Sequence, residues 1–279
     1  MSNIFVQNEI DEFEKEKQMK NNILIQNEID EYIDVISKEW TDPLPSPIIQ
    51  EHEGFQVVRE DLINGSSKVR ASDYLVSTLT GVEELVYGSC PATGHAQIAL
   101  SVLAKRYGKK AVVFMAKRSL DKLTKQQKHA IREGVDFRWV KMGMLNVTES
   151  HAKKYASENP EKRLLVPIGV NHPAVVASYA VVARQMEIQP KEVWTVGSSG
   201  TLTRGLQQGW PDADFHCVSV GHKGDFGRAK VYQCPLTFPQ NVKKEDAPPF
   251  PSVSNYDAKA WKYMREHASP GALFWNVSG

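Results

Sequence analysis

The sequence predicts an α/β fold in which parallel sheets are covered by helices on both faces. Two observations carry this prediction: short apolar runs of strand length recur along most of the chain, and segments with helical periodicity separate them. Strands and helices that alternate in this way form parallel sheets that are buried on both faces. The 279 residues are enough for one large domain or two modest ones that share a cleft.

The composition is that of a soluble globular protein. Hydrophobic residues make up 41% of the chain, and 34 basic side chains nearly balance 33 acidic ones. The net charge therefore gives no argument for nucleic-acid binding, although it leaves a local basic groove open. The apolar runs are too short to span a bilayer, and the first residues are acidic where a secretory signal would be basic.

Cysteine usage completes this picture. Cys90, Cys217 and Cys234 are few and lack the spacing of metal ligands. We therefore expect no bound metal and a reducing, cytoplasmic setting, which includes the cytoplasm of an infected host.

The chain is expected to begin with a helical arm over residues 1–40. The sequence QNEIDEF at 7–13 returns as QNEIDEY at 26–32. Apolar residues recur among the charges at roughly helical intervals, as Ile23, Ile29, Tyr32, Ile33 and Ile36. This pattern is typical of amphipathic surface helices, and an arm that binds a partner or mediates oligomerisation is the alternative. The prolines of residues 43–47 end the segment.

Strands and helices alternate after the arm. Strands are expected at 84–87, 111–115, 164–168, 193–196 and 216–220. Helices are expected at 97–107, 124–133, 148–158 and 174–186. Since ligands of parallel sheets bind beyond the carboxyl ends of the strands, the loops at those ends are where functional residues are expected.

The first such loop contains Lys68, in the turn GSSKVR at 65–70 that follows a short extended run. Most lysines are solvated surface charges, so this turn alone assigns no function. A lysine that forms a Schiff base must be neutral part of the time, which requires burial or a neighbouring charge that lowers its pKa.

A second loop, GSSGT at 197–201, follows a strand and precedes a helix expected to begin near Leu202. Glycines let successive N–H groups point inward, and the helix start adds positive potential, which together suit a phosphate. An ordinary strand–helix turn is the plain alternative. The loop lacks the lysine of a Walker motif, and the paired acidic residues that usually precede a phosphoribosyltransferase loop are absent.

Three further segments are candidates. The loop GSCPATGH at 88–95 opens a helix with hydroxyls and free N–H groups that suit a carboxylate, although Thr93 could simply cap that helix and His95 could simply pack. The segment YDAK at 256–259 is otherwise a capped helix start, and residues 272–279 predict a buried strand.

In this order, these segments resemble the fold type II pyridoxal-phosphate (PLP) enzymes related to tryptophan synthase β. They are most similar to the branch of 1-aminocyclopropane-1-carboxylate deaminase and D-cysteine desulfhydrase. The matching family patterns are G-x-N-K-x-R at 65–70, G-G-I-Q-S-N-H at 89–95, P-x-G-G-S-N-P-x-G-x-x-G-Y at 167–179, G-S-G-G-T at 197–201, Y-E-G-K at 256–259 and L-F-x-H-T-G-G at 273–279.

The resemblance, which covers roughly residues 50–279, implies two open, twisted parallel-sheet domains with PLP in the cleft between them. The larger, PLP-binding domain would comprise 41–82 and 187–279, and the smaller α/β domain would comprise 83–186. The resemblance also implies a homodimer.

The resemblance further implies roles for individual residues. Lys68 would form the Schiff base and, once released, act as general base at the substrate α-carbon. Asp257 would lie beside the pyridine nitrogen, and Thr93 and Tyr256 would contact the substrate. The remaining cofactor contacts would come from Gly94, His95, Gly197, Ser198, Ser199, Gly200 and Thr201.

Several positions depart from the family pattern. Ser67 and Gly94 replace asparagines, and Ser89-Cys90 and Gly169-Val170 replace paired glycines. These losses leave a cofactor site but put a named substrate in doubt, since they open room near the reacting carbon.

The sequence therefore predicts a PLP-dependent enzyme of the deaminase, lyase or decarboxylase kind that acts on an amino acid or amino-acid-like amine. One alternative is a tailoring enzyme for an amino acid conjugated to a larger molecule, such as a modified nucleotide base, which is the one way in which nucleic acid would be a partner. The other is a non-catalytic binding or scaffold protein on the same fold.

Overall fold

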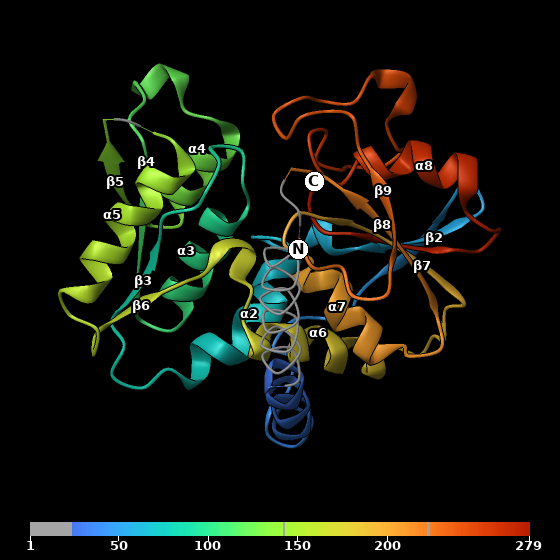
Figure 1. Ribbon diagram of the computed structural model, residues 1–279, viewed down its shortest axis with the longest axis horizontal. Coiled ribbons are helices and arrows are strands. Elements are labelled where there is room, and N and C mark those ends of the chain that lie inside the picture. Colours follow the sequence, from blue (N-terminus) through green and yellow to red (C-terminus); the bar gives the residue numbers. More distant parts are fainter. Residues whose placement is uncertain (1–23, 142, 222–223) are drawn as a thin grey trace, which may run out of the picture.

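A computed structural model describes residues 24–141, 143–221 and 224–279 and confirms the predicted fold class (Figure 1). The strands form a six-stranded sheet in the order β1-β2-β10-β7-β8-β9 and a four-stranded sheet in the order β5-β4-β3-β6. Strand pairing is parallel throughout the described part except between β1 and β2, which form an antiparallel edge.

The larger sheet combines strands from both ends of the described chain. Its members are β1 (Ile49–His52), β2 (Phe55–Arg59), β10 (Leu273–Asn276), β7 (Glu192–Gly197), β8 (Asp214–Ser219) and β9 (Lys230–Gln233). β10 lies between β2 and β7, and all four of its residues are buried. The buried strand predicted within 272–279 is thus confirmed.

Helices cover both faces of this sheet. α7 (Thr201–Gly209) and α8 (Lys259–His267) both pack against β7 and β8. Val193 of β7 packs with Leu206 of α7, whereas its neighbour Trp194 packs with Trp261 of α8. Because successive residues of a strand point to opposite faces, the two helices lie on opposite sides of the sheet.

The smaller sheet has the same layered construction. Its strands are β3 (Glu84–Tyr87), β4 (Lys110–Ala116), β5 (Asp136–Val140) and β6 (Arg163–Leu165), and its helices are α3 (Ala96–Arg106), α4 (Lys125–Arg132) and α5 (Leu145–Ser157). Leu85 packs on the side of α3, and the next residue, Val86, on the side of α5. β5 was not among the expected strands.

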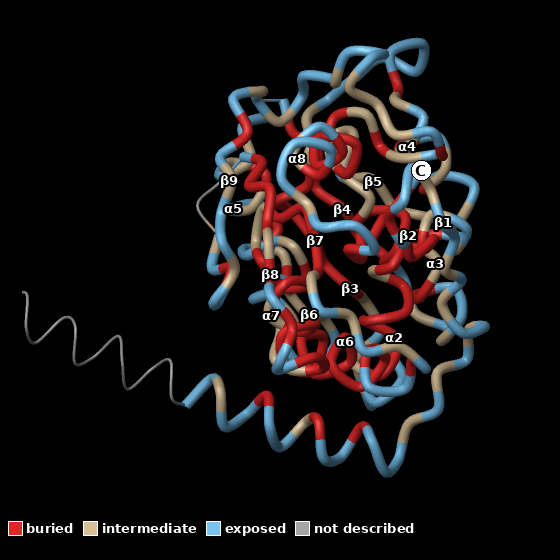
Figure 2. The backbone as a smooth tube through the Cα atoms, turned by 90° about the vertical axis from the view of Figure 1, so that its right-hand side faces the viewer, coloured by how far each residue is buried: buried red, intermediate tan, exposed pale blue. Residues whose placement is uncertain are grey.

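One hydrophobic core joins the two sheets. α2 (Ser67–Thr78) packs against α3, and also against α6 (Pro173–Gln185), which in turn packs on α7. Buried residues of this core come from both sheets, such as Leu85 and Met115 from the smaller and Trp275 from the larger. Figure 2 shows that buried backbone runs through β3, β7 and the helices α2 and α6. The predicted domain boundaries remain a prediction.

The described part of the arm is a helix over 24–39 that packs on this body. Ile29, Ile33 and Ile36 are buried against α2 and α6, so exposed and buried stretches alternate along the helix (Figure 2). The second copy of the repeat lies in this helix, and the first copy, at 7–13, lies outside the described residues. No helix of the described chain is long and apolar enough to cross a membrane.

Candidate functional site

A cavity of about 530 Å³ lies at the carboxyl ends of strands from both sheets. Its lining includes the ends of β3 and β4 on one side and the loops that follow β7 and β10 on the other. A much smaller pocket of about 20 Å³ shares Lys68 and Tyr256 with it and is bounded by residues 196–203. The predicted loops thus converge on two neighbouring pockets that share part of their lining.

Lys68 is the second residue of α2 and is fixed by the turn before it. Gly65 and Ser66 both have positive φ, and the Ser66 hydroxyl accepts a hydrogen bond from the Lys68 N–H at 3.4 Å. The helix start is also tied to the end of β10, because the Ser67 N–H donates to the Val277 carbonyl at 3.1 Å. Trp275 Nε1 donates to the Ser67 hydroxyl at 3.1 Å. Ser67, where the family pattern has asparagine, is therefore a structural anchor for the lysine.

The Lys68 amine lies in a desolvating environment. Burial lowers its pKa from the ordinary value, and the electrostatic effects of the nearby acidic groups, Asp257 first, oppose that shift. Burial also lowers the pKa of His95 to about 4, with a further contribution from the positive charge of Lys68. The site therefore favours a partly neutral amine beside a neutral imidazole, which is the state that a nucleophilic lysine requires.

The loop 197–201 forms the start of α7 and faces Lys68 across the small pocket. The Ser199 and Thr201 hydroxyls lie 3.0 Å apart, and Gly200 has φ +83°, in the left-handed region. Hydroxyls and free N–H groups at a helix start are the donors that hold a phosphate.

Close approach of backbone explains the glycines of this loop. A Cβ on Gly200 would lie 1.7 Å from the Asp225 carbonyl oxygen, and a Cβ on Gly169 would lie 2.3 Å from the Ser199 hydroxyl. Gly169, from the segment that resembles the family at 167–179, thus closes the cradle from the other side. Side chains at these positions would displace the loop.

Asp257 lies behind the cavity rather than in its wall. It is fully buried and lines neither pocket. Its carboxylate accepts hydrogen bonds from the Ser278 hydroxyl at 3.1 Å and from the Val277 N–H at 3.4 Å. Burial raises its pKa to about 7, against the effects of Lys68 and of these hydrogen bonds. Ser278, which does line the cavity, stands between Asp257 and the cavity.

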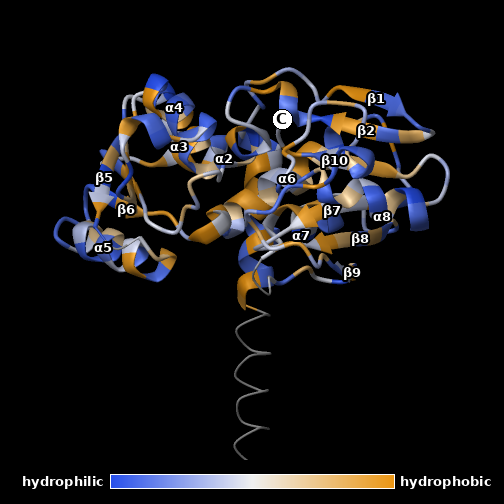
Figure 3. Ribbon diagram, turned by 90° about the horizontal axis from the view of Figure 1, so that it is seen from above, coloured by the Kyte–Doolittle hydropathy of each residue, from blue (hydrophilic) through white to orange (hydrophobic). Residues whose placement is uncertain are grey.

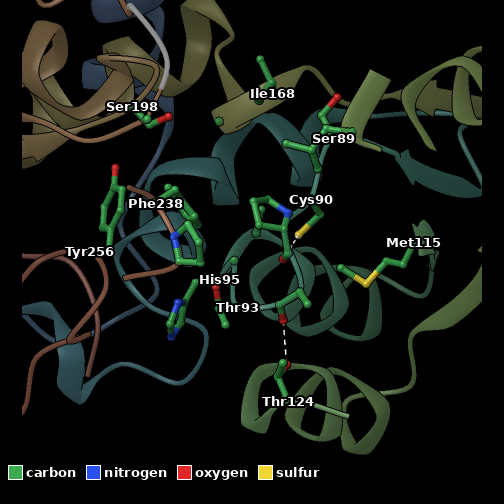
Figure 4. A pocket seen from close by; sticks show the side chains of 18 of the residues that line it. Ser89, Cys90, Thr93, His95, Met115, Thr124, Ile168, Ser198, Phe238 and Tyr256 are labelled. Atoms are coloured by element: carbon green, nitrogen blue, oxygen red, sulfur yellow. Dashed lines mark hydrogen bonds between the residues drawn. The ribbon is translucent and has the colours of Figure 1, made fainter. Parts of the chain in front are cut away.

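The loop before α3 supplies the opposite wall. Thr93, Gly94 and His95 all line the cavity (Figure 4). A Cβ at Gly94 would lie 3.1 Å from both the Cys90 thiol and the Pro91 carbonyl, so the turn leaves little room for the asparagine of the family pattern. Burial raises the pKa of the Cys90 thiol to about 12, which keeps the thiol protonated.

Asn255 joins the two walls and was not predicted from the sequence. Its side-chain amide donates to the Thr93 hydroxyl at 3.1 Å and to the Phe238 carbonyl at 3.2 Å. Lys259, which is buried, donates to the Thr237 carbonyl at 2.9 Å. Phe238 in turn lies with its ring 6.0 Å from that of Tyr256, at the cavity wall. Only the position of Asn255 beside the YDAK segment could have drawn attention to it.

The structure therefore brings together most of the predicted site residues. Those that line the main cavity are Lys68, Thr93, Gly94, His95, Ser198, Ser199 and Tyr256. Gly197, Gly200 and Thr201 line the small pocket. Asp257 is the one that lines neither.

Comparisons with known proteins agree with this arrangement. An "ACC deaminase homologue" has a similar structure, with a TM-score of 0.73 at 15% identity over 88% of this chain and 94% of that chain. Diaminopropionate ammonia lyase of Escherichia coli gives a TM-score of 0.61 at 12% identity over 89% and 87%. Threonine deaminase isoform 2 of Solanum lycopersicum gives 0.58 at 14% identity over 90% and 84%. These similarities confirm the fold.

Among curated proteins, this chain is 24% identical to a "Glycyl-dTMP PLP-dependent decarboxylase" of Pseudomonas phage M6, over 79% of this chain and 92% of the phage protein. No protein-family model matches the chain.

Proposed function

From the fold of the type II PLP enzymes, which this chain has, we propose that the protein is a PLP-dependent enzyme acting at the α-carbon of an amino acid or amino-acid-like amine. One observation carries the proposal: Lys68, whose amine is desolvated, and the loop 197–201 at the start of α7 line the same small pocket, and Lys68 also lines the large cavity next to it. An amine that attacks an aldehyde and a cradle that holds a phosphate are the two anchors that PLP requires. The phage relative, whose name contains the same cofactor, supports this assignment.

The cofactor end of the site is built from the larger sheet. Ser199, Thr201 and the N–H groups at the start of α7 would bind the phosphate. When bound, PLP supplies an electron sink for charge that develops at the substrate α-carbon. Ser278, held by Asp257, would face the pyridine nitrogen, so that Asp257 acts through Ser278 rather than by direct contact.

Lys68 has two tasks in this scheme. Its neutral amine would hold the cofactor at the aldehyde, and with a substrate amine bound in its place, the Lys68 Nζ would take a proton from the substrate α-carbon or return one to it. The lowered pKa serves both tasks, because a fully protonated ammonium can do neither.

The substrate end lies against the smaller sheet. The Thr93 hydroxyl oxygen accepts from Asn255, so its own proton is directed elsewhere and is available to a substrate carboxylate. The start of α3, three residues after Thr93, adds positive potential for that anion. Because His95 is neutral at its lowered pKa, it would not add a second positive charge near Lys68.

Covalent trapping tests the proposal directly. The protein is incubated with PLP, reduced with borohydride and digested, and the modified peptide is identified by mass spectrometry. We expect modification of Lys68 and none of Lys259, a second buried lysine with lowered pKa that does not line the cavity. Modification elsewhere, or none at any lysine, would contradict the proposal and leave the scaffold alternative.

A second form of the function has its own support. The phage relative is named for a nucleotide that carries a glycyl group, and the cavity extends from Lys68 as far as Arg118 and Thr124 on the smaller sheet. We therefore propose an amino acid conjugated to a nucleotide base as the specific substrate class. Glycyl-thymidine monophosphate should perturb the visible absorption of the PLP-loaded protein at lower concentration than free glycine does; equal potency would favour a free amino acid.

A homodimer and a cytoplasmic location also remain proposals. Sedimentation analysis would test the homodimer.

A further inference from the structure

The positive charge of the molecule is concentrated in one short segment beside the cavity. Residues 117–132 contain six basic side chains and one acidic one, a formal charge of +5 against +1 for the whole chain. The rest of the sequence therefore carries a net −4. We call Lys117, Arg118, Lys122, Lys125, Lys128 and Arg132 the basic ridge.

The basic ridge is exposed and has no acidic partner within the described part of the chain. All six side chains are exposed. Some basic residues elsewhere in the molecule are paired, as Arg70 is with Glu60 and Arg163 with Glu84. In contrast, no ridge residue takes part in an ion pair between described residues. Six clustered charges without counter-charges repel one another, so an anionic partner would stabilise them.

The ridge is continuous with the proposed substrate cavity. Arg118 lines the cavity, and so does Thr124, which caps the start of α4 and donates to the Ala92 carbonyl at 2.7 Å (Figure 4). Lys125, Lys128 and Arg132 follow at helical spacing, so they share one face of α4. Figure 3 shows α4 as largely hydrophilic. Arg118 is thus the ridge residue at the cavity, and the three α4 residues lie on the exposed side of that helix, away from the cavity-lining Gln127.

Exposed apolar side chains accompany the charges. Leu120 is 80% exposed, Met144 is 61% exposed and Ile168, which lines the cavity, is 44% exposed. Leu120 lies within the ridge segment, and Met144 precedes the cavity-lining Leu145. Apolar side chains among unpaired basic residues fit a partner that combines phosphates with flat apolar faces, as a nucleic-acid strand does.

We propose that the basic ridge binds the sugar–phosphate backbone of a nucleic-acid strand and presents a base of that strand, with its attached amino acid, to Lys68. The proposal rests on the nucleotide-conjugate form of the function above and extends it: the substrate is a residue within a strand rather than a free mononucleotide. An acidic protein surface or an anionic membrane is less well matched, because neither would enter the cavity that the ridge borders.

Binding of a strand is measured by fluorescence anisotropy with a labelled single-stranded thymidine oligonucleotide, on the PLP-loaded protein at several salt concentrations. The variant Lys122→Glu/Lys125→Glu/Lys128→Glu should bind on the order of 10–100-fold more weakly and should lower the slope of log affinity against log salt by about 2, since each strand phosphate contributes about 0.7.

The matched control is Lys154→Glu/Lys191→Glu/Lys262→Glu, which makes the same change of charge at three exposed lysines outside the ridge. It should retain most of the affinity and the salt slope. Equal losses in the two variants would mean that only net charge matters, and would overturn the proposal. So would binding of thymidine monophosphate as tight as that of the oligonucleotide, or binding to phosphatidylserine–phosphatidylcholine vesicles without binding to the oligonucleotide.

The readout separates this proposal from the proposed chemistry. Strand binding can fail while Lys68 is still trapped by PLP and borohydride, and it can succeed in a protein that never forms that bond.

Discussion

The two walls of the cavity differ in how they are held. The wall from the larger sheet is anchored by hydrogen bonds to main chain and buried groups, as at Ser67, Ser278 and Asp257. The wall from the smaller sheet is also bonded to main chain, as by Gln97 at the Ala92 carbonyl, but it is tied across the cavity at Thr93 and carries the exposed Arg118, which forms no ion pair with a described residue. Buried polar groups that satisfy one another are costly to change, whereas exposed groups change freely.

The difference matches where the sequence departs from its family pattern. The serine that replaces asparagine on the larger-sheet side has acquired a structural bond to Trp275. On the smaller-sheet side, Gly94 stands where the family pattern has asparagine, and neither Gly94 nor Cys90 has a polar side chain as long as that of asparagine. Under the proposed function, the wall from the larger sheet would hold the cofactor, and the wall from the smaller sheet would determine substrate preference.

The largest expected effect is the loss of activity when Lys68, in the wall from the larger sheet, is replaced. Lys68→Ala removes both the attachment point and the proton-transfer group, so kcat should fall by more than about 10³-fold. Lys259→Met removes another buried amine, which only holds the 237–238 main chain, and should retain PLP attachment. Steady-state kinetics and borohydride trapping on both variants provide the measurement. Comparable activity in Lys68→Ala and the wild type would refute the assignment.

Gly200→Ala tests the phosphate cradle. The new Cβ would lie 1.7 Å from the Asp225 carbonyl oxygen, so the loop must move and PLP affinity should fall on the order of tenfold or more. Gly271→Ala is a matched control, since Gly271 has a similar φ of +78° and nothing within 4 Å of a Cβ. Both variants carry the backbone strain, but only the first should lose PLP in equilibrium titrations. An equal loss in both would trace the effect to strain alone.

Asn255→Ala tests the link between the walls. Without the amide donor, the Thr93 hydroxyl is free to rotate, and KM for a carboxylate-bearing substrate should rise about 5–10-fold, as expected for one hydrogen bond. Affinity for the corresponding amine without a carboxylate should not change. If both ligands lost affinity equally, Asn255 would be a purely structural residue. Combining Asn255→Ala with Thr93→Ala should add little to the effect of the second change.

The last expected effect is on stability and concerns pH and Asp257. Its pKa in the folded protein is raised to about 7 from the ordinary 3.8, so folding takes up a proton between these values. The free energy of unfolding of the PLP-free protein should therefore decrease as pH rises from about 4 to 7, on the order of 4 kcal/mol in total, since one pKa unit corresponds to about 1.4 kcal/mol. Asp257→Asn should flatten this dependence in thermal melts. An unchanged slope in the variant would assign it to other groups.

Much of the fold followed from the sequence because its buried elements have clear periodicity. The strand at 84–87 was predicted with the bounds that the structure has, and the helices at 97–107 and 174–186 differ from α3 and α6 by one residue at each end. β5 and β9 were missed because edge strands carry polar residues such as Arg138 and Lys230 on their exposed sides. β6 is shorter than expected because a 3-10 turn follows it at 168–170.

The site was predictable only where a loop carries its own signature. Lys68 and the 197–201 loop have local glycine and hydroxyl patterns, whereas Asn255 meets Thr93 across 162 positions of sequence. Asp257 was expected beside the pyridine nitrogen of the cofactor, a role that stays a prediction, and its carboxylate bonds to Val277 and Ser278, which follow β10 and line the cavity. Positive charge at 117–132 was hidden by a nearly neutral total. The Asn255–Thr93 contact and the surroundings of Asp257 depend on which segments meet in space, which periodicity does not encode, whereas the charge at 117–132 is contiguous and a count by segment finds it.

The place of β10 between β2 and β7 has a consequence for how the protein is made. β2 and the Lys68 turn are synthesised early, yet their neighbour in the sheet appears more than two hundred residues later. Until then the edge of β2 has no partner on that side, and Ser67 cannot bond to Val277 or Trp275. A nascent chain on the ribosome would thus expose the unpaired edge of β2, and the turn that holds Lys68 would not yet be fixed. The strands of the smaller sheet, β3 to β6, follow one another along the chain, so we expect this sheet to form first.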